Sequence, residues 1–145
     1  MVLTFSAILA ALLFLFRPLQ RNRFFILHAV LIIGSAYFLE THFFKVTPFV
    51  PKTFLLFLVF QLISINLVTI IAYGVDKRAA INGSWRVPEA QLHSLELLGG
   101  WCGAFLAQKL FHHKTKKKSF RAVFWLMLFF QLIFIWFILS YLRLL

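Results

Sequence analysis

Two long apolar runs constrain the fold of this chain more than any other feature. Residues 53–75 and 122–142 are each long enough to cross the hydrocarbon core of a bilayer, which takes about 20 helical residues. Apolar residues make up 62% of the chain, and its mean hydropathy is +0.91. A single soluble core of 145 residues cannot bury that much apolar surface. We therefore predict an all-α integral membrane protein.

Two shorter apolar runs, Val2 to Phe16 and Phe24 to Leu39, come first in the chain. Basic residues follow the first run rather than precede it, which favours a retained helix over a cleaved signal peptide. Residues 40–52 contain Pro48 and Pro51 and are predicted to form a loop. The four runs together predict four transmembrane helices.

The segment from Ala90 to Phe111 has the length of a span but contains several polar residues and a central Gly99-Gly100 pair. If it enters the membrane and returns, every Lys and Arg except Lys45, Lys52 and Arg143 lies on the cytoplasmic side, with the amino terminus outside. If it crosses, this positive-inside bias disappears. We predict one broken helical pair, re-entrant or interfacial, that bends at the glycines and leaves both polar loops in the cytoplasm.

A polar stripe is predicted on the helix that contains residues 53–75 and on its continuation. At 100° per residue its members fall within about a quarter of the helix circumference. Hydrogen bonding to other helices is the favoured interpretation, and a polar pathway for an ion or ligand is the alternative. An ion pair that fixes the next loop and a catalytic role both stay open for the aspartate. The stripe consists of Asn66, Thr69, Tyr73, Asp76 and Lys77.

Three titratable residues, Glu89, His93 and Glu96, share one face of the helix that is expected to start at Pro88. Carboxylate and imidazole donors suit a divalent metal, but three such groups are too few for a closed site. We favour structural roles, in which Glu89 caps the helix or pairs with Arg86 and His93 hydrogen-bonds at a helix contact.

A cluster of basic residues is predicted in the two cytoplasmic loops and at the start of the last helix. Positive-inside selection alone would produce such residues as an anchor for the last helix. The functional alternative is the binding of an anionic lipid headgroup or another phosphate-bearing ligand, because each Lys or Arg contributes about 1 kcal/mol near an anionic leaflet. The cluster consists of Arg86, His113, Lys114, Lys116, Lys117, Lys118 and Arg121.

Four short motifs occur in order in the second half of the chain. They are Asp76-Lys77, Arg86-Val87-Pro88-Glu89, Gly99-Gly100 with Gly103, and His113-Lys114-Thr115 with Lys117 and Phe120. On these motifs the chain resembles the domain of unknown function 1294 family of small bacterial membrane proteins, over roughly residues 70–125. Cys102 and His112 depart from that pattern, since many relatives have Pro and Arg there.

The resemblance implies a family core over residues 53–145, a variable amino-terminal helix pair over residues 1–52, and a bacterial inner membrane location. Some relatives are fused to a cold-shock domain, which this chain lacks, and the basic loop has no base-stacking aromatic residues between its lysines. A nucleic-acid partner is therefore disfavoured for this chain alone.

Apart from the disfavoured association with nucleic acid, three functions are compatible with these patterns. We favour a binding protein for an anionic headgroup or another phosphate-bearing ligand, with membrane lipids as partners. An oligomeric ion channel or transporter lined by the broken helix is the first alternative. An enzyme acting on a phosphorylated lipid, with Glu89 or His93 as base, is less favoured because no nucleophile motif accompanies them. No cofactor is predicted.

Overall fold

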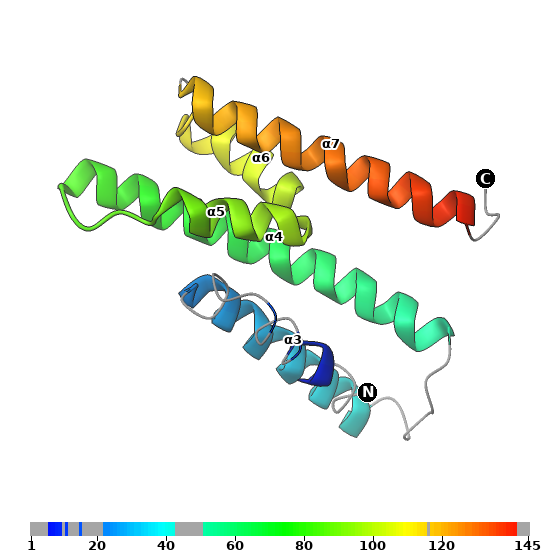
Figure 1. Cartoon of the computed structure of the whole chain (residues 1–145). Coiled ribbons are helices and arrows are strands. Elements are labelled where there is room, and N and C mark those ends of the chain that lie inside the picture. Colours follow the sequence, from blue (N-terminus) through cyan, green and yellow to red (C-terminus); the bar gives the residue numbers. More distant parts are fainter. Residues whose placement is uncertain are drawn as a thin grey trace.

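The computed structural model describes residues 6–9, 11, 15, 22–42, 51–115 and 117–141. Each secondary-structure element within those residues is a helix, which confirms the all-α prediction. The long helices extend in roughly the same direction across Figure 1, and the short ones fold back against α4. The elements are α3 (Arg23–His42), α4 (Pro51–Asn82), α5 (Glu89–Leu95), the π-helical turn η1 (Glu96–Gly100), α6 (Trp101–Phe111) and α7 (Lys118–Tyr141).

Three helical segments are long and apolar enough to cross a membrane: Arg23–His42, Leu58–Asn82 and Lys118–Phe137. They coincide with the second, third and fourth predicted runs. The first predicted helix, residues 2–16, lies mostly outside the described residues. The described part of the chain therefore supports a membrane protein with three candidate spans, where the sequence predicts four.

Helix α4 is longer than predicted at both ends. It begins at Pro51 rather than after the predicted loop, because proline is well accommodated at the first position of a helix. It also continues past Val75, because residues 76–82 contain neither Gly nor Pro. Gly83 ends it with a φ of 64°, and the Ser84 N–H donates to the Ala79 carbonyl at 3.0 Å, as in a Schellman cap.

The predicted break at the paired glycines is present. Gly99 has a φ of 106°, a conformation that favours glycine, and the chain turns there between α5 and α6. Asn66 of α4 bridges the bend: its Nδ2 donates to the Gly99 carbonyl at 3.1 Å and its Oδ1 accepts from the Gly103 N–H at 2.6 Å. The Asn66 amide thus provides hydrogen-bond partners on both sides of the bend.

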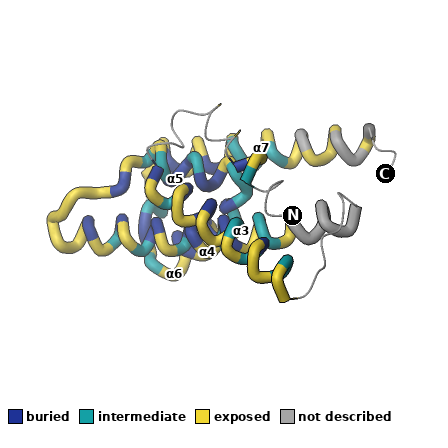
Figure 2. The backbone as a smooth tube through the Cα atoms, turned by 90° about the horizontal axis from the view of Figure 1, so that it is seen from below, coloured by how far each residue is buried: buried dark blue, intermediate teal, exposed yellow. Residues whose placement is uncertain are grey.

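The core lies where α4, the broken helix and the start of α7 meet, and Figure 2 shows the buried residues concentrated there. Helix α3 packs against α4 through polar as well as apolar contacts. The His28 ring lies 2.9 Å from the Ser64 hydroxyl and 2.8 Å from the Gln61 amide oxygen. Most of α7, by contrast, presents exposed apolar side chains, as expected of a lipid-facing helix. The main core consists of Ile65, Val68, Ala72, Tyr73, Val87, Leu92, Leu95, Ala104, Ala107, Phe120 and Phe124.

Candidate functional site

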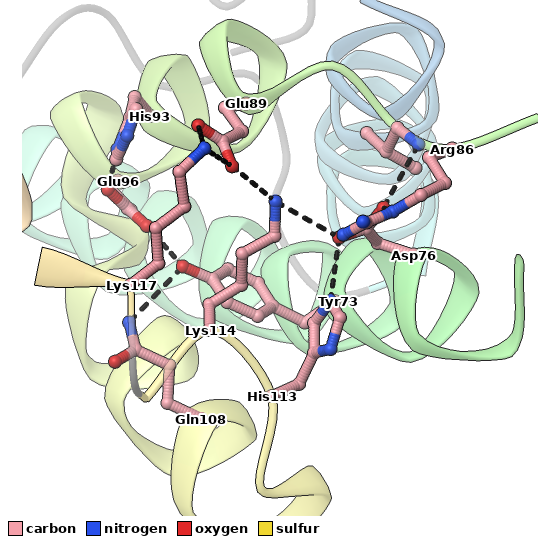
Figure 3. A network of polar contacts seen from close by, with 11 residues as sticks. Tyr73, Asp76, Arg86, Glu89, His93, Glu96, Gln108, His113, Lys114 and Lys117 are labelled. Atoms are coloured by element: carbon pink, nitrogen blue, oxygen red, sulfur yellow. Dashed lines mark hydrogen bonds and ion pairs between the residues drawn. The ribbon is translucent and has the colours of Figure 1, made fainter. Parts of the chain in front are cut away.

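A fully buried carboxylate, Asp76, forms the centre of the candidate site near the C-terminal end of α4. Its oxygens accept hydrogen bonds from the Val87 N–H at 3.2 Å and from Arg86 at 3.3 and 3.4 Å. His113 Nε2 lies 2.7 Å away and Lys114 Nζ 3.4 Å away (Figure 3). Asp76 therefore joins the segment that follows α4 to the loop that follows α6.

A second carboxylate, Glu89, continues the network from the first turn of α5. Lys114 Nζ and Lys117 Nζ each lie 2.8 Å from Glu89 Oε1 (Figure 3). These two ammonium groups lower the pKa of Glu89 from 4.5 to about 2. The Lys114 side chain is only 5% exposed and bridges the two carboxylates. The Lys114 charge is thus neutralised by carboxylates within the protein.

The pH dependence of stability provides a test of this pair. Because the pKa of Glu89 is depressed in the folded state, its contribution is complete above pH 4.5 and is lost as the pH falls towards about 2. We expect the native chain to lose stability in detergent across that window. Glu89→Gln should lose less stability over the same pH range. An equal fall in the free energy of unfolding for the two proteins would contradict the pairing.

A cavity of about 440 Å³ opens beside the two carboxylates. We call it the connector cavity, because it lies between the segment after α4 and the loop after α6. Arg86 and Lys117 are half-exposed on its wall, with 51% and 54% of their side chains accessible. His112 and Lys114 have positive φ values of 48° and 61°, which are rare for residues other than glycine and are often found at functional sites. The lining residues are Arg86, Glu89, His112, His113, Lys114, Thr115 and Lys117.

The predicted basic cluster is divided by the structure. All four of Arg86, His113, Lys114 and Lys117 line the connector cavity, but the side chains of His113 and Lys114 are nearly buried against Asp76, whereas those of Arg86 and Lys117 are half-exposed. Lys118 and Arg121 are exposed on the first turn of α7 and do not line that cavity. Lys116 lies outside the described residues.

The predicted polar stripe contacts the broken helix. Asn66 bridges the bend, and Thr69 lies against Gly100, where an added Cβ would collide with its hydroxyl. The Tyr73 hydroxyl donates to Glu96 Oε1 and accepts from Gln108 Nε2 at 3.3 Å. Lys77 is partly buried, without an ion pair to any described residue. The stripe is therefore used for packing and hydrogen bonding between helices.

The three candidate metal ligands do not converge. Glu89 faces the lysines, while His93 Nδ1 lies 2.6 Å from Glu96 Oε2 inside the core. No group of three or more His, Cys, Asp or Glu side chains is arranged for a metal within the described residues. His93 also stacks on Phe120, with ring centroids 4.3 Å apart. The geometry favours structural roles for this set, but the role predicted for Glu89 is wrong. Glu89 pairs with Lys114 and Lys117 and makes no capping hydrogen bond, and Arg86 pairs with Asp76 instead.

Comparisons with known proteins agree with the motifs. The model of the family described as "Protein of unknown function (DUF1294)" matches residues 66–120. "Uncharacterized protein YsdA" of Bacillus subtilis (strain 168) is 38% identical over 60 residues, which are 41% of this chain and 67% of that protein. The chain belongs to the DUF1294 family. No solved structure matches it significantly.

The DUF1294 match contains nearly the whole polar network. It begins at Asn66, which bridges the bend, and ends at Phe120, which packs on His93 and Tyr73. The DUF1294 segment thus corresponds to a structural unit: the second half of α4, the broken helix and the basic loop.

Sequence reasoning missed three polar residues that hold this unit in place. Gln108 bonds to Tyr73, and Gln131 of α7 donates to the Glu96 and Leu97 carbonyls at 2.8 and 2.6 Å. Asn22, ahead of α3, donates to the Gln91 carbonyl and to Ser94. An amide inside an apolar run was the available signal for Gln131, but nothing in the sequence indicates its partner.

Proposed function

We propose that this chain binds a phosphate-bearing group in the connector cavity, on the cytoplasmic side of a bacterial inner membrane. Two half-exposed cations that line the cavity, Arg86 and Lys117, carry the proposal. Arg86 uses Nε and Nη2 for Asp76, which leaves Nη1 without a hydrogen bond to any described residue. A guanidinium so held is suited to a phosphate oxygen.

The local charge supports an anionic ligand. Arg86, Lys114 and Lys117 contribute three cations around the cavity, against the carboxylates of Asp76 and Glu89. His112 and His113 add two imidazoles. Among the described residues, no apolar side chain lines the connector cavity, so the phosphate group itself, rather than an acyl chain, fits there. The group could belong to a lipid headgroup or to a soluble phosphate.

The proposed topology places both polar connectors on the same side of the membrane. In it, the broken helix enters the membrane or lies at its surface and returns, as the positive-inside rule predicts. The ion pairs from Asp76 and Glu89 to the loop after α6 support this arrangement, because they join the two connectors directly. Figure 1 shows both connectors at one end of the bundle.

Replacing Lys117 with Gln tests the proposal. The variant keeps Lys114 on Glu89, so the connectors stay joined while one cavity cation is removed. We expect affinity for pyrophosphate, a soluble probe, and for dihexanoyl phosphatidylglycerol, a lipid probe, to fall by about tenfold in titration calorimetry. The matched control is Arg78→Gln, which removes an exposed cation of α4 that does not line the cavity.

Each outcome decides the proposal or the source of the phosphate. Equal loss with Arg78→Gln would indicate a general charge effect and would overturn the site. Binding of neither probe to the native chain would do the same. If only the lipid binds, and Lys117→Gln weakens it, the ligand is a headgroup; if only pyrophosphate does, it is a soluble phosphate.

The transport alternative has weaker support from the geometry. Asn66, Thr69 and Tyr73, which would line the path, are hydrogen-bonded to neighbouring groups. The lipid-enzyme alternative would place Glu89 as a base, but two lysines hold it as a carboxylate of low pKa. Binding therefore stays the preferred proposal.

A further inference from the structure

A second cavity, of about 250 Å³, lies between α6 and the start of α7. We call it the interfacial cavity. Unlike the connector cavity, it combines cationic and aromatic walls. The lining residues are Phe105, Gln108, Lys109, Thr115, Arg121, Phe124 and Trp125.

Charge and aromatic residues follow the same order on both walls. On α6, Phe105 precedes Lys109 by one helical turn, and Lys109 is nearer the loop. On α7, Arg121 is nearer the loop and Trp125 follows one turn later. A helix rises about 1.5 Å per residue, so the Cα atom of each aromatic residue lies roughly 6 Å further along its helix from the loop than the Cα atom of its cation. The cavity thus has a cationic rim and an aromatic interior.

The two rim cations have no carboxylate partner within the described residues. The chain has four acidic residues in all, and three of them, Asp76, Glu89 and Glu96, are bonded within the polar network. The fourth, Glu40, lies near the end of α3, away from the loop after α6 (Figure 1). Lys109 instead lies 4.5 Å from the Phe105 ring centroid. An anion that neutralises this rim must come from outside the chain.

The position of the cavity agrees with the chemistry of a bilayer interface. Arg121 is in the first turn of the candidate span Lys118–Phe137, and Trp125 is half-exposed one turn deeper. Cationic and tryptophan side chains are typical of the headgroup level, with apolar groups beneath them. Phe105 is also exposed, so the aromatic interior is open to an acyl chain.

We propose that the interfacial cavity binds one anionic phospholipid of the surrounding leaflet. The lipid phosphate lies between Lys109 and Arg121, and the start of an acyl chain packs on Phe105, Phe124 and Trp125. The site is separate from the connector cavity: of the lining residues that the structure describes, the two share Thr115 alone. It therefore does not depend on the function proposed above.

Native mass spectrometry of the full chain tests this site, with phosphatidylglycerol and phosphatidylcholine as probes. We expect the native chain to retain phosphatidylglycerol preferentially, because only that lipid has a net negative charge. The double variant Lys109→Gln, Arg121→Gln should lower phosphatidylglycerol retention by about tenfold or more and leave phosphatidylcholine unchanged. Phe105→Ala should weaken retention of both lipids.

Two control variants make the result decisive. Lys118→Gln removes an exposed cation from the same turn of α7 without touching either cavity, and should leave retention as in the native chain. Lys117→Gln alters only the connector cavity. Loss with Lys118→Gln, or full retention by the double variant, would overturn the proposal. Loss with Lys117→Gln alone would assign the lipid to the connector cavity.

Discussion

Replacing Asp76 with Asn is expected to cost about 3–5 kcal/mol of unfolding free energy. The substitution keeps the shape of the side chain but removes the charge that faces His113, Lys114 and Arg86. Lys114 is 5% exposed and cannot turn to solvent without breaking the loop. Denaturant unfolding in detergent, followed by circular dichroism, measures the loss.

A double substitution separates this electrostatic effect from simple misfolding. Adding Lys114→Met to Asp76→Asn removes a cation that has lost one of its two carboxylate partners, and Lys117 still neutralises Glu89. We expect the double variant to be more stable than Asp76→Asn alone. The stabilities of the single and double variants together give the coupling energy between the two positions. A loss below about 1 kcal/mol for Asp76→Asn, typical of exposed ion pairs, would contradict the central role of this carboxylate.

Gly103→Ala is expected to separate α6 from α4. A Cβ at this position would collide with the carbonyl of Asn66 and approach its Cα to 3.0 Å. Those atoms belong to the backbone of α4 and cannot move aside without shifting the helix. Overpacking of this kind costs about 1–3 kcal/mol, and the loss of the hydrogen bond from Gly103 N–H to Asn66 adds about 1 kcal/mol.

The control for this prediction is the same substitution at Gly34 of α3. A Cβ there meets no atom within 4 Å, and the residue lies within a regular helix. Gly34→Ala should be neutral or stabilise the helix by about 0.5–1 kcal/mol. Thermal unfolding in detergent measures the stability of both glycine variants. Equal changes in stability at the two glycines would show that the close approach at Gly103 does not contribute to stability.

The sequence predicted the helices and the bend because both depend on local chemistry. Apolar runs of spanning length identified α4 and α7, a shorter run identified α3, and the glycine pair identified the turn that Gly99 makes. The apolar run ends at Val75 and the predicted polar stripe continues to Lys77, but apolar character does not indicate how much further the helix extends. The chain stays helical until Gly83 provides a left-handed cap.

The sequence predicted which residues belong to the site but not which of them contact one another. The motifs brought Asp76, Arg86, Glu89 and Lys114 to attention, since each is unusual in so apolar a chain. Which cation faces which carboxylate depends on how the connectors meet, and no periodicity encodes that. The sequence predicted His113 and Lys114 as ligand-binding residues but did not predict that both would pair with Asp76 as well as line the connector cavity.

The bend at Gly99 also has a consequence for the order of assembly. Asn66 of α4 bonds to Gly99 and Gly103 across it, and Nε2 of Gln131 in α7 donates to the Glu96 and Leu97 carbonyls just ahead of it. During synthesis α4 is made first and α7 last. We therefore expect the broken helix, formed by α5, η1 and α6, to reach its final structure only after α7 has been translated. Chains truncated before Gln131 should leave the ribosome with the broken helix incompletely folded.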